Sequence, residues 1–292
     1  MKQNYLSEYI DELRTKEKSE NTVDAYRRDL IHLLSFLEEE ELSFEDFNEI
    51  EVSNFIGYLL DLNMSRATIA RHLVSIRNFY KYLRKKNKVR EAPILYFELP
   101  EIKRNLPEPL SVEEVEVILS APDISTMKGK RDKAILEVLY ATGIKATELI
   151  ELRYRDLDMA RGNLSVKGKK NKNRLVPLGS FAMDSIELYL SSRVDPVVGA
   201  SVLFPSHRGD QMTRQGLWKI LKEYARISGL SESINLNTLR HSYAVHMLSG
   251  GADITTLSQL LGHNDIKATT IYLKLVKNKK FKEVYEDAHP RA

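Results

Sequence analysis

The sequence predicts a mainly α-helical chain of two domains, with an antiparallel β-hairpin in the second domain. Three observations favour this class. Apolar residues recur every three or four positions through most of the chain, which is the spacing of amphipathic helices. Glycine and proline, 13 and 9 among 292 residues, are about half as frequent as usual. Four of the prolines fall in residues 93–109, and proline favours extended chain over helix.

The first domain is predicted to span residues 1–100 and to contain four helices. The clearest apolar stripe consists of residues 69, 73, 76, 80 and 83, and Ser65 is placed to cap the start of that helix. The other three helices are predicted at Leu6–Lys16, around Val23–Leu37 and at Val52–Leu62.

The proline-rich stretch places a linker at residues 101–109 and a second domain at residues 110–292. Ser111 and Glu114 form a capping-box pattern that starts a new helix directly after the linker. In Gly162–Leu178, Leu164 and Val166 alternate with polar residues on one side of the basic segment 168–173, and Leu175 and Val176 lie on the other, which predicts a β-hairpin with a lysine-rich turn. The helices predicted in the second domain are Val112–Ser120, Lys130–Ala141, Ala146–Leu152, Ser180–Ser191, Arg214–Ser228, Thr238–Leu248, Ile254–Leu261, Lys267–Leu275 and Lys280–Asp287.

Charge is unevenly distributed in the first domain. Residues 31–51 hold eight acidic side chains and no Lys or Arg, whereas residues 66–90 hold nine basic side chains and no acid. A basic block of this kind indicates an anion-binding face, although alone it is more often a solvated helix surface.

Several classes of protein are excluded by what the chain lacks. It has no cysteine, which excludes disulfides, thiolate metal sites and cysteine nucleophiles. No apolar run approaches 18 residues, so we expect no membrane span and a cytoplasmic protein. Metal-ligating and glycine-rich phosphate motifs are also missing, so we expect no metal and no cofactor.

Short polar motifs occur near the C-terminus. Asn237 and Arg240 begin a predicted helix and lie one turn apart, where free N–H groups add anion affinity. His263 follows a glycine, and Tyr272 lies near the end of another predicted helix. Each residue alone is typical of an ordinary cap, loop or half-buried core position.

The order of these motifs resembles that of the tyrosine recombinase (phage integrase) family, of the Xer type, over essentially the whole chain. The segments that carry the resemblance include SRATIARHLVSIRNFYKYL, ATGIKATEL, VKGKKNKNRLVPL, NTLRHSYAVHML, LLGHNDIKATTIYLKL and the ending EVYEDAHPRA. The resemblance implies an N-terminal four-helix core-binding (SAM-like) domain. It also implies a C-terminal catalytic domain whose small antiparallel sheet includes the hairpin.

The resemblance assigns a role to each motif residue. Tyr272 matches the nucleophile, which attacks a phosphodiester, forms a 3′-phosphotyrosine and releases a 5′-hydroxyl without a cofactor. Arg240 matches an arginine that holds the phosphate. Lys169, at the hairpin turn, matches the general acid for the leaving 5′-oxygen. His263 matches the His or Trp position that contacts the phosphate.

Two positions depart from the family pattern. Lys145 stands where the family has a second arginine, and Asn237 stands where it has a histidine. Lysine keeps the charge and loses the bidentate fork, and asparagine donates a hydrogen bond but carries no proton. Two interpretations therefore stay open at this point: a site-specific recombinase, or a DNA-binding homologue with impaired or no cleavage activity that serves as a structural subunit or regulator.

The resemblance also implies the partners. They are double-stranded DNA with two inverted half-sites, held between the two domains as in a clamp, and a tetramer of this chain or of this chain and a paralogue. The C-terminal helix, about residues 277–292, is expected to dock into a neighbouring subunit. The implied role is chromosome dimer resolution, in chromosome partition and cell division, or a related integration and excision reaction, with activation by a translocase. The expected DNA contacts are Arg66, Arg71, Arg77, Lys81, Arg84, Lys85, Arg214 and Lys219.

Overall fold

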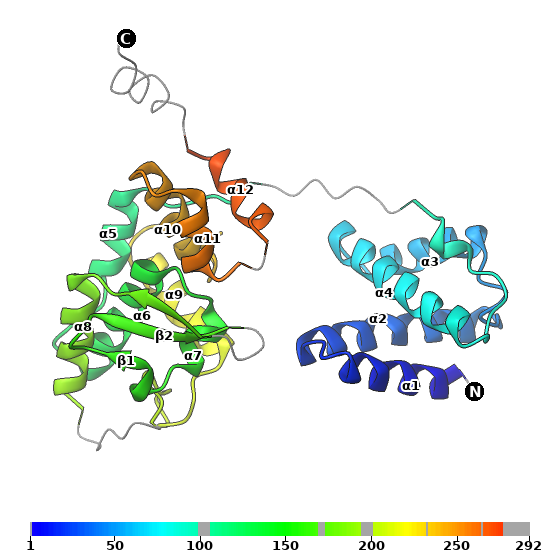
Figure 1. The fold of residues 1–292 in the computed structure, drawn as a ribbon, viewed down its shortest axis with the longest axis horizontal. Helices are drawn as coiled ribbons and strands as arrows, with labels where there is room; N and C mark the ends of the chain where they lie inside the picture. Colours follow the sequence, from blue (N-terminus) through cyan, green and yellow to red (C-terminus); the bar gives the residue numbers. More distant parts are fainter. Residues whose placement is uncertain are drawn as a thin grey trace, which may run out of the picture. The chain divides into compact units, whose positions relative to one another are not determined.

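The computed structural model describes residues 2–98, 106–168, 173–193, 201–231, 233–263 and 265–276. It is mainly helical with one small antiparallel sheet, as the sequence predicts. The chain divides into two compact units, Met1–Arg104 and Asn105–Ala292, each with its own hydrophobic core (Figure 1). Among the described residues, no helix is long and apolar enough to cross a membrane.

The described part of the N-terminal unit, residues 2–98, contains four α-helices: α1 (Lys2–Thr15), α2 (Glu20–Glu39), α3 (Glu49–Asp61) and α4 (Arg66–Lys85). A short 3-10 helix, η1 (Pro93–Leu95), follows and packs on α4. The side chains of Ser19, Asn48 and Ser65 each accept a backbone N–H at the start of α2, α3 and α4. These caps satisfy amide groups that have no partner within the helix, and they fix where each helix begins.

The apolar stripes of α2 and α4 pack together in the core of the first unit. Leu30 and Leu37 of α2 are fully buried, as are Leu73 and Ile76 of α4. A cluster of aromatic rings, with Phe47 stacked on Tyr80 at 5.7 Å between ring centroids, closes the core toward α3. The predicted stripe on α4 is therefore the one that faces the core.

A buried carboxylate joins α2 to α4. Asp29 is fully buried, and Arg71 Nη1 lies 2.5 Å and 2.6 Å from its two oxygens. Ser75 Oγ donates to the same carboxylate at 2.6 Å, and His72 Nε2 lies 3.3 Å away. A buried carboxylate needs such partners, so Arg71 serves the packing of two helices.

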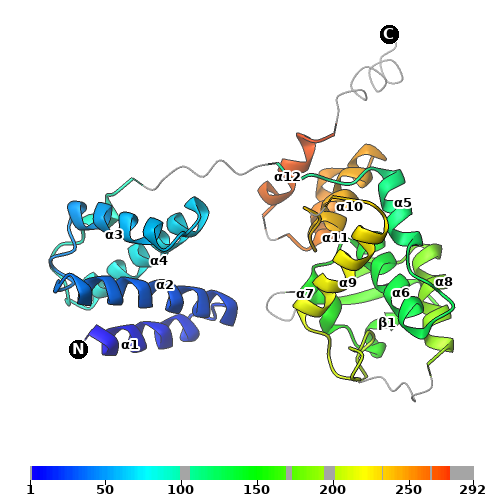
Figure 2. The same cartoon turned by 180° about the vertical axis from the view of Figure 1, so that it is seen from behind.

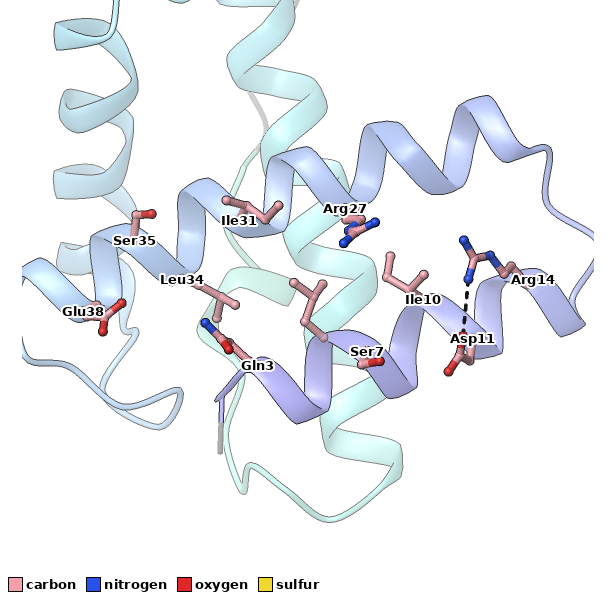
Figure 3. Close-up of a pocket in the computed structure, with 11 residues that line it drawn as sticks. Gln3, Ser7, Ile10, Asp11, Arg14, Arg27, Ile31, Leu34, Ser35 and Glu38 are labelled. Carbon is pink, nitrogen blue, oxygen red and sulfur yellow. Dashed lines mark ion pairs between the residues drawn. The ribbon is translucent and has the colours of Figure 1, made fainter.

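A hollow of about 430 Å³ lies between α1 and α2 (Figure 3). Its lining mixes Leu6, Ile10, Ile31 and Leu34 with charged residues, and Arg14 Nη1 lies 3.5 Å from Asp11 Oδ1 at one end. All the residues that line the hollow belong to α1 and α2.

The C-terminal unit begins with α5 (Val112–Ser120), α6 (Met127–Thr142), α7 (Ala146–Glu151) and the 3-10 helix η2 (Tyr154–Asp156). A sheet of strand order β1-β2-β3 follows, with β1 (Leu157–Asp158), β2 (Asn163–Lys167) and β3 (Asn173–Pro177). The remaining helices are α8 (Ser180–Ser191), α9 (Arg214–Ile227), α10 (Thr238–Ser249), α11 (Ile254–Leu261) and α12 (Lys267–Leu273).

The predicted hairpin forms β2 and β3, which pair antiparallel with Leu164 opposite Val176 and Lys167 opposite Asn173. Both Leu164 and Val176 are buried, so these apolar residues lie on the face of the sheet that covers the core. The two-residue strand β1 extends the sheet on the other side of β2. Strand β1 is too short to produce an alternating pattern, so the sequence did not predict it.

Helix α6 is the centre of the second unit. It packs against α8 on one side and α10 on another, while α10 also packs against α11 and α12 (Figures 1 and 2). Gly143 ends α6 in the left-handed conformation at φ +58°, and a Cβ there would lie 2.3 Å from the Tyr243 ring. Glycine is therefore required at this close approach of α6 and α10.

Candidate active site

The predicted site residues lie on the elements that meet around α10. Arg240 occupies the first turn of α10, His263 follows α11, and Tyr272 lies on α12. Lys145 precedes α7, directly after the turn at Gly143. Because α10 packs against α11 and α12, the fold joins Arg240 to His263, 23 residues away in the chain, and His241 to Tyr272, 31 residues away (Figure 2).

Arg240 is 5% exposed and is held by backbone carbonyls. Its Nη1 donates to Gly143 O at 2.5 Å, and its Nη2 donates to Leu261 O at 2.7 Å and to His263 Nε2 at 2.9 Å. Burial lowers the pKa of Arg240 from its ordinary value, and the nearby Glu148 opposes that change. An arginine stays charged at neutral pH in proteins, so the site contains a fixed, buried cation.

His263 is oriented by two hydrogen bonds. Its Nε2 accepts from Arg240, so its Nδ1 carries the proton and donates to Thr269 Oγ1 at 2.7 Å. Burial lowers the pKa of His263 to about 4, with further lowering by the charges of Arg240, Lys145 and Arg174. His263 is therefore a neutral imidazole near pH 7, with a defined tautomer.

Tyr272 is 3% exposed. Its Oη lies 2.9 Å from Nδ1 of His241, the residue after Arg240 on α10. Burial raises the pKa of the Tyr272 phenol, and the charge of Arg240 partly offsets that rise. The phenol is therefore protonated at neutral pH, and it must lose that proton when its oxygen becomes a nucleophile.

Lys145 lies beside a carboxylate that is already paired. Its Nζ is 3.8 Å from Glu148 Oε1, and its backbone N–H donates to Glu148 Oε2 at 2.8 Å. Arg174 of β3 holds the same carboxylate in a bidentate pair, at 3.0 Å and 2.8 Å. Burial alone would raise the pKa of Glu148, but the hydrogen bonds from Arg174 and from the Lys145 N–H lower it overall.

Arg174 also donates from Nε to Leu260 O at 2.8 Å, so one guanidinium links β3, α7 and the end of α11. A Cβ at Gly262, where φ is +64°, would lie 2.7 Å from Arg174 Nη1. Glycine at 262 therefore satisfies both the turn before His263 and the space that Arg174 needs. Arg174, Glu148, His241 and Thr269 were all missing from the set of site residues predicted from the sequence.

Asn237 is the N-cap of α10 and is exposed, with its backbone N–H bonded to Asn235 Oδ1 at 2.9 Å. Asn237 and Arg240 lie in the same turn, but Arg240 is buried and Asn237 is open to solvent. Lys169 and the C-terminal segment 277–292 lie outside the described residues. Among the described residues, no group of three or more His, Cys, Asp or Glu side chains could hold a metal ion.

The predicted DNA contacts fall into two groups. Arg71 is bound to buried Asp29, and Arg77 donates to the backbone carbonyls of Ile94 and Phe97. Both therefore hold the N-terminal unit together. Arg71 is nevertheless exposed, with 44% of its side chain open to solvent. Also exposed are Arg66, Lys81, Arg84 and Lys85 on α4, and Arg214 and Lys219 on α9.

Comparison with known proteins identifies the class. Residues 108–279 match the phage integrase family, and residues 6–87 match the phage integrase N-terminal SAM-like domain. The chain therefore belongs to the phage integrase family, the tyrosine recombinases that break and rejoin DNA at specific sites, as the resemblance in the sequence indicated.

Similar proteins extend over nearly the whole chain. It is 35% identical to tyrosine recombinase XerD of Staphylococcus haemolyticus, covering 98% of this chain and 99% of the relative. It is 39% identical to tyrosine recombinase XerD of Listeria monocytogenes, covering 94% of each. The solved structure of the XerH recombinase bound to a palindromic difH substrate superposes with a TM-score of 0.77 at 22% identity, over 90% of this chain and 79% of that one.

Proposed function

We propose that this chain cuts DNA with Tyr272 and rejoins it through a 3′-phosphotyrosine, as a Xer-type recombinase. The observation that carries the proposal is the cluster around Arg240. A buried arginine donates to His263, and the next residue along α10 is hydrogen-bonded to the Tyr272 oxygen. A phosphodiester bound at this cluster would lie close to a cation, an imidazole and a phenol.

Each side chain has a chemical role in this proposal. The hydrogen bonds of Arg240 use three of its five N–H donors, and the other two bind the scissile phosphate as negative charge develops. Lys145 supplies a second cation near the phosphate. Lys169 protonates the leaving 5′-oxygen. The phosphotyrosine keeps the energy of the broken bond, so the religation step needs no cofactor.

The covalent intermediate tests this function directly. The DNA sequence that the protein binds would first be selected from random DNA. A nick would then be placed in it, so that the short strand with the 5′-hydroxyl that cleavage releases diffuses away. We expect the unchanged protein to accumulate a covalent adduct that Tyr272→Phe lacks while still binding the DNA. Tyr243→Phe is the matched control, because Tyr243 is also buried and lies on α10. Binding without any adduct would instead support the inactive homologue.

We further propose that the exposed basic side chains of α4 contact DNA phosphates. Replacing Lys81, Arg84 and Lys85 together by alanine should weaken binding and reduce the slope of log K against log salt by about 2.7, or roughly 0.9 per phosphate contact. The control is the triple alanine variant at Arg14, Lys16 and Lys18, exposed basic residues at the end of α1. Equal slopes in the two variants, measured by fluorescence anisotropy, would show that α4 does not contact DNA.

We propose that the active assembly is a tetramer on two DNA sites, each with two inverted half-sites, formed by this chain alone or with a paralogue. Relatives of this chain are named tyrosine recombinase XerD, and we propose for it a Xer-type role in the cytoplasm, in chromosome dimer resolution with an activating translocase. One structural neighbour is described as a lambda integrase dimer on a core site, which supports paired binding. Residues 277–292 are proposed to join neighbouring subunits.

A further inference from the structure

We propose that His241 is the base that takes the proton from Tyr272 during DNA cleavage. The proposal rests on the proposed role of Tyr272 as the nucleophile. His241 is next to the phosphate-binding Arg240 in the sequence, but its side chain contacts a different partner. Arg240 contacts Gly143, Leu261 and His263, whereas His241, one position further around α10, contacts the reacting oxygen.

Tyr272 needs a proton acceptor. Its side chain is buried and its pKa lies above the ordinary value. A general base must be within about 2.6–3.2 Å of the atom that it deprotonates. Nδ1 of His241 meets that condition, at 2.9 Å from Tyr272 Oη.

The other candidates for this base are already hydrogen-bonded or cannot take up a proton. His263 receives a hydrogen bond from Arg240 at Nε2 and engages Thr269 at Nδ1, so its acceptor nitrogen is already used. Asn237 stands where the family pattern has a histidine, and an amide side chain carries no titratable proton. His241 remains as the imidazole in contact with the nucleophile.

The surroundings of the His241 imidazole keep it neutral. Burial and the charge of Arg240 lower the pKa of His241, so the ring is neutral and able to accept a proton near pH 7. Arg240 on the same helix is the charged group that lowers the pKa of His241, and Tyr272 faces His241 from α12. Glu108 and Glu114 line the same groove as His241. From the other packed helices, α6 directs Tyr140 to His246, and α11 carries no titratable side chain.

His241 also lines that groove, which has a volume of about 370 Å³ between the segment Leu106–Leu110 and the residues that precede α10. With Nδ1 accepting from Tyr272, the neutral ring carries its own hydrogen at Nε2. The histidine therefore lies between the buried nucleophile and a solvent-accessible hollow. This placement allows the proton taken from the phenol to be exchanged with water.

The proposed step balances in atoms and charge. The Tyr272 O–H bond breaks as an N–H bond forms at His241 Nδ1, and the phenolate oxygen attacks the phosphorus. The bond from phosphorus to the 5′-oxygen breaks, and that oxygen leaves as a hydroxyl with a proton from Lys169. Religation reverses each transfer, so His241 returns its proton to Tyr272.

The test compares two histidines of the same helix. His246 Nδ1 lies 2.9 Å from Tyr140 Oη, which reproduces the His241–Tyr272 pair away from the site. On the nicked substrate, His241→Gln is expected to slow single-turnover cleavage by about 10²–10⁴-fold, the usual contribution of a general base. His246→Gln should cleave at close to the unchanged rate, and both variants should bind DNA.

A second variant separates proton transfer from packing. His241→Ala leaves a space beside the open groove, and added imidazole should restore cleavage in proportion to its concentration. When sulfur replaces the bridging 5′-oxygen of the substrate, the leaving group is a thiolate that needs no proton. This substrate should therefore restore cleavage by Lys169→Ala but not by His241→Gln. Slow cleavage that imidazole does not restore would overturn the proposal and give His241 a packing role.

Cleavage by His241→Gln that is as fast as, or faster than, that of the unchanged protein would also overturn the proposal. That result would mean that the hydrogen bond only holds Tyr272 in its buried position. Failure of the proposed function would be recognised separately, because the unchanged protein would then form no covalent adduct at all.

Discussion

Replacing Arg240 by alanine is expected to slow DNA cleavage by at least about 10²–10³-fold, the cost of removing one donor that stabilises charge in a transition state. Stability should fall as well. The carbonyls of Gly143 and Leu261 would lose the buried donor that now binds them. An unsatisfied buried group costs about 1–3 kcal/mol, so the free energy of unfolding should drop by about 2 kcal/mol or more.

Single-turnover cleavage and thermal unfolding would measure the two effects of Arg240→Ala. Arg226→Ala is the control, since Arg226 is exposed at the end of α9. Arg240→Lys keeps the charge but loses the planar fork that reaches two carbonyls and His263. It should therefore also cleave slowly. An Arg240→Ala protein that cleaves within tenfold of the unchanged rate would contradict the role of Arg240 at the phosphate.

Changing Lys145 to arginine and Asn237 to histidine together is expected to raise the cleavage rate by about 10²–10³-fold. The structure supports this expectation for Lys145. Its Nζ is 3.8 Å from a Glu148 carboxylate whose two oxygens are already held by Arg174. In Lys145→Arg, a second planar guanidinium would be available to bind two phosphate oxygens. It would not depend on pairing with the Glu148 carboxylate.

Single-turnover rates of Lys145→Arg, Asn237→His and the double variant would divide this gain between the two positions. Lys133→Arg is a matched control, because Lys133 is likewise partly buried and paired with a glutamate, Glu137, at 2.7 Å. Most of the gain should come from Lys145→Arg, since Asn237 is exposed and Lys145 lies close enough for its charge to lower the pKa of His263. An unchanged rate in the double variant would mean that the site already works with the residues it has.

Much of the fold could be predicted from the sequence because burial follows the helical and strand periods. The stripe from Ile69 to Leu83 is buried in α4, and Leu164 and Val176 cover the core from β2 and β3. Helix starts were visible where a side chain caps the backbone, as at Ser65 and Ser111. The short strand β1 has too few residues to carry a period, and it was missed.

The site was predicted less completely, because its supporting contacts join distant parts of the chain. Arg174 and Glu148 are 26 residues apart, and only folding brings β3 beside α7. The same limit applies to Arg71, whose ion pair with the buried Asp29, 42 residues away in the chain, is set by the packing of α4 against α2. His241 lies next to a predicted residue, but its contact with Tyr272 depends on how α12 packs against α10.

The most direct test of the account is to identify the amino acid that becomes joined to DNA. The adduct formed on the nicked substrate would be digested with nuclease and protease, and the modified peptide sequenced by mass spectrometry. The chain has 14 tyrosines, so the result is specific. The account predicts a nucleotide joined through its 3′-phosphate to Tyr272. A nucleotide on another tyrosine, such as the nearby Tyr243, or a 5′-phosphate linkage, would contradict it.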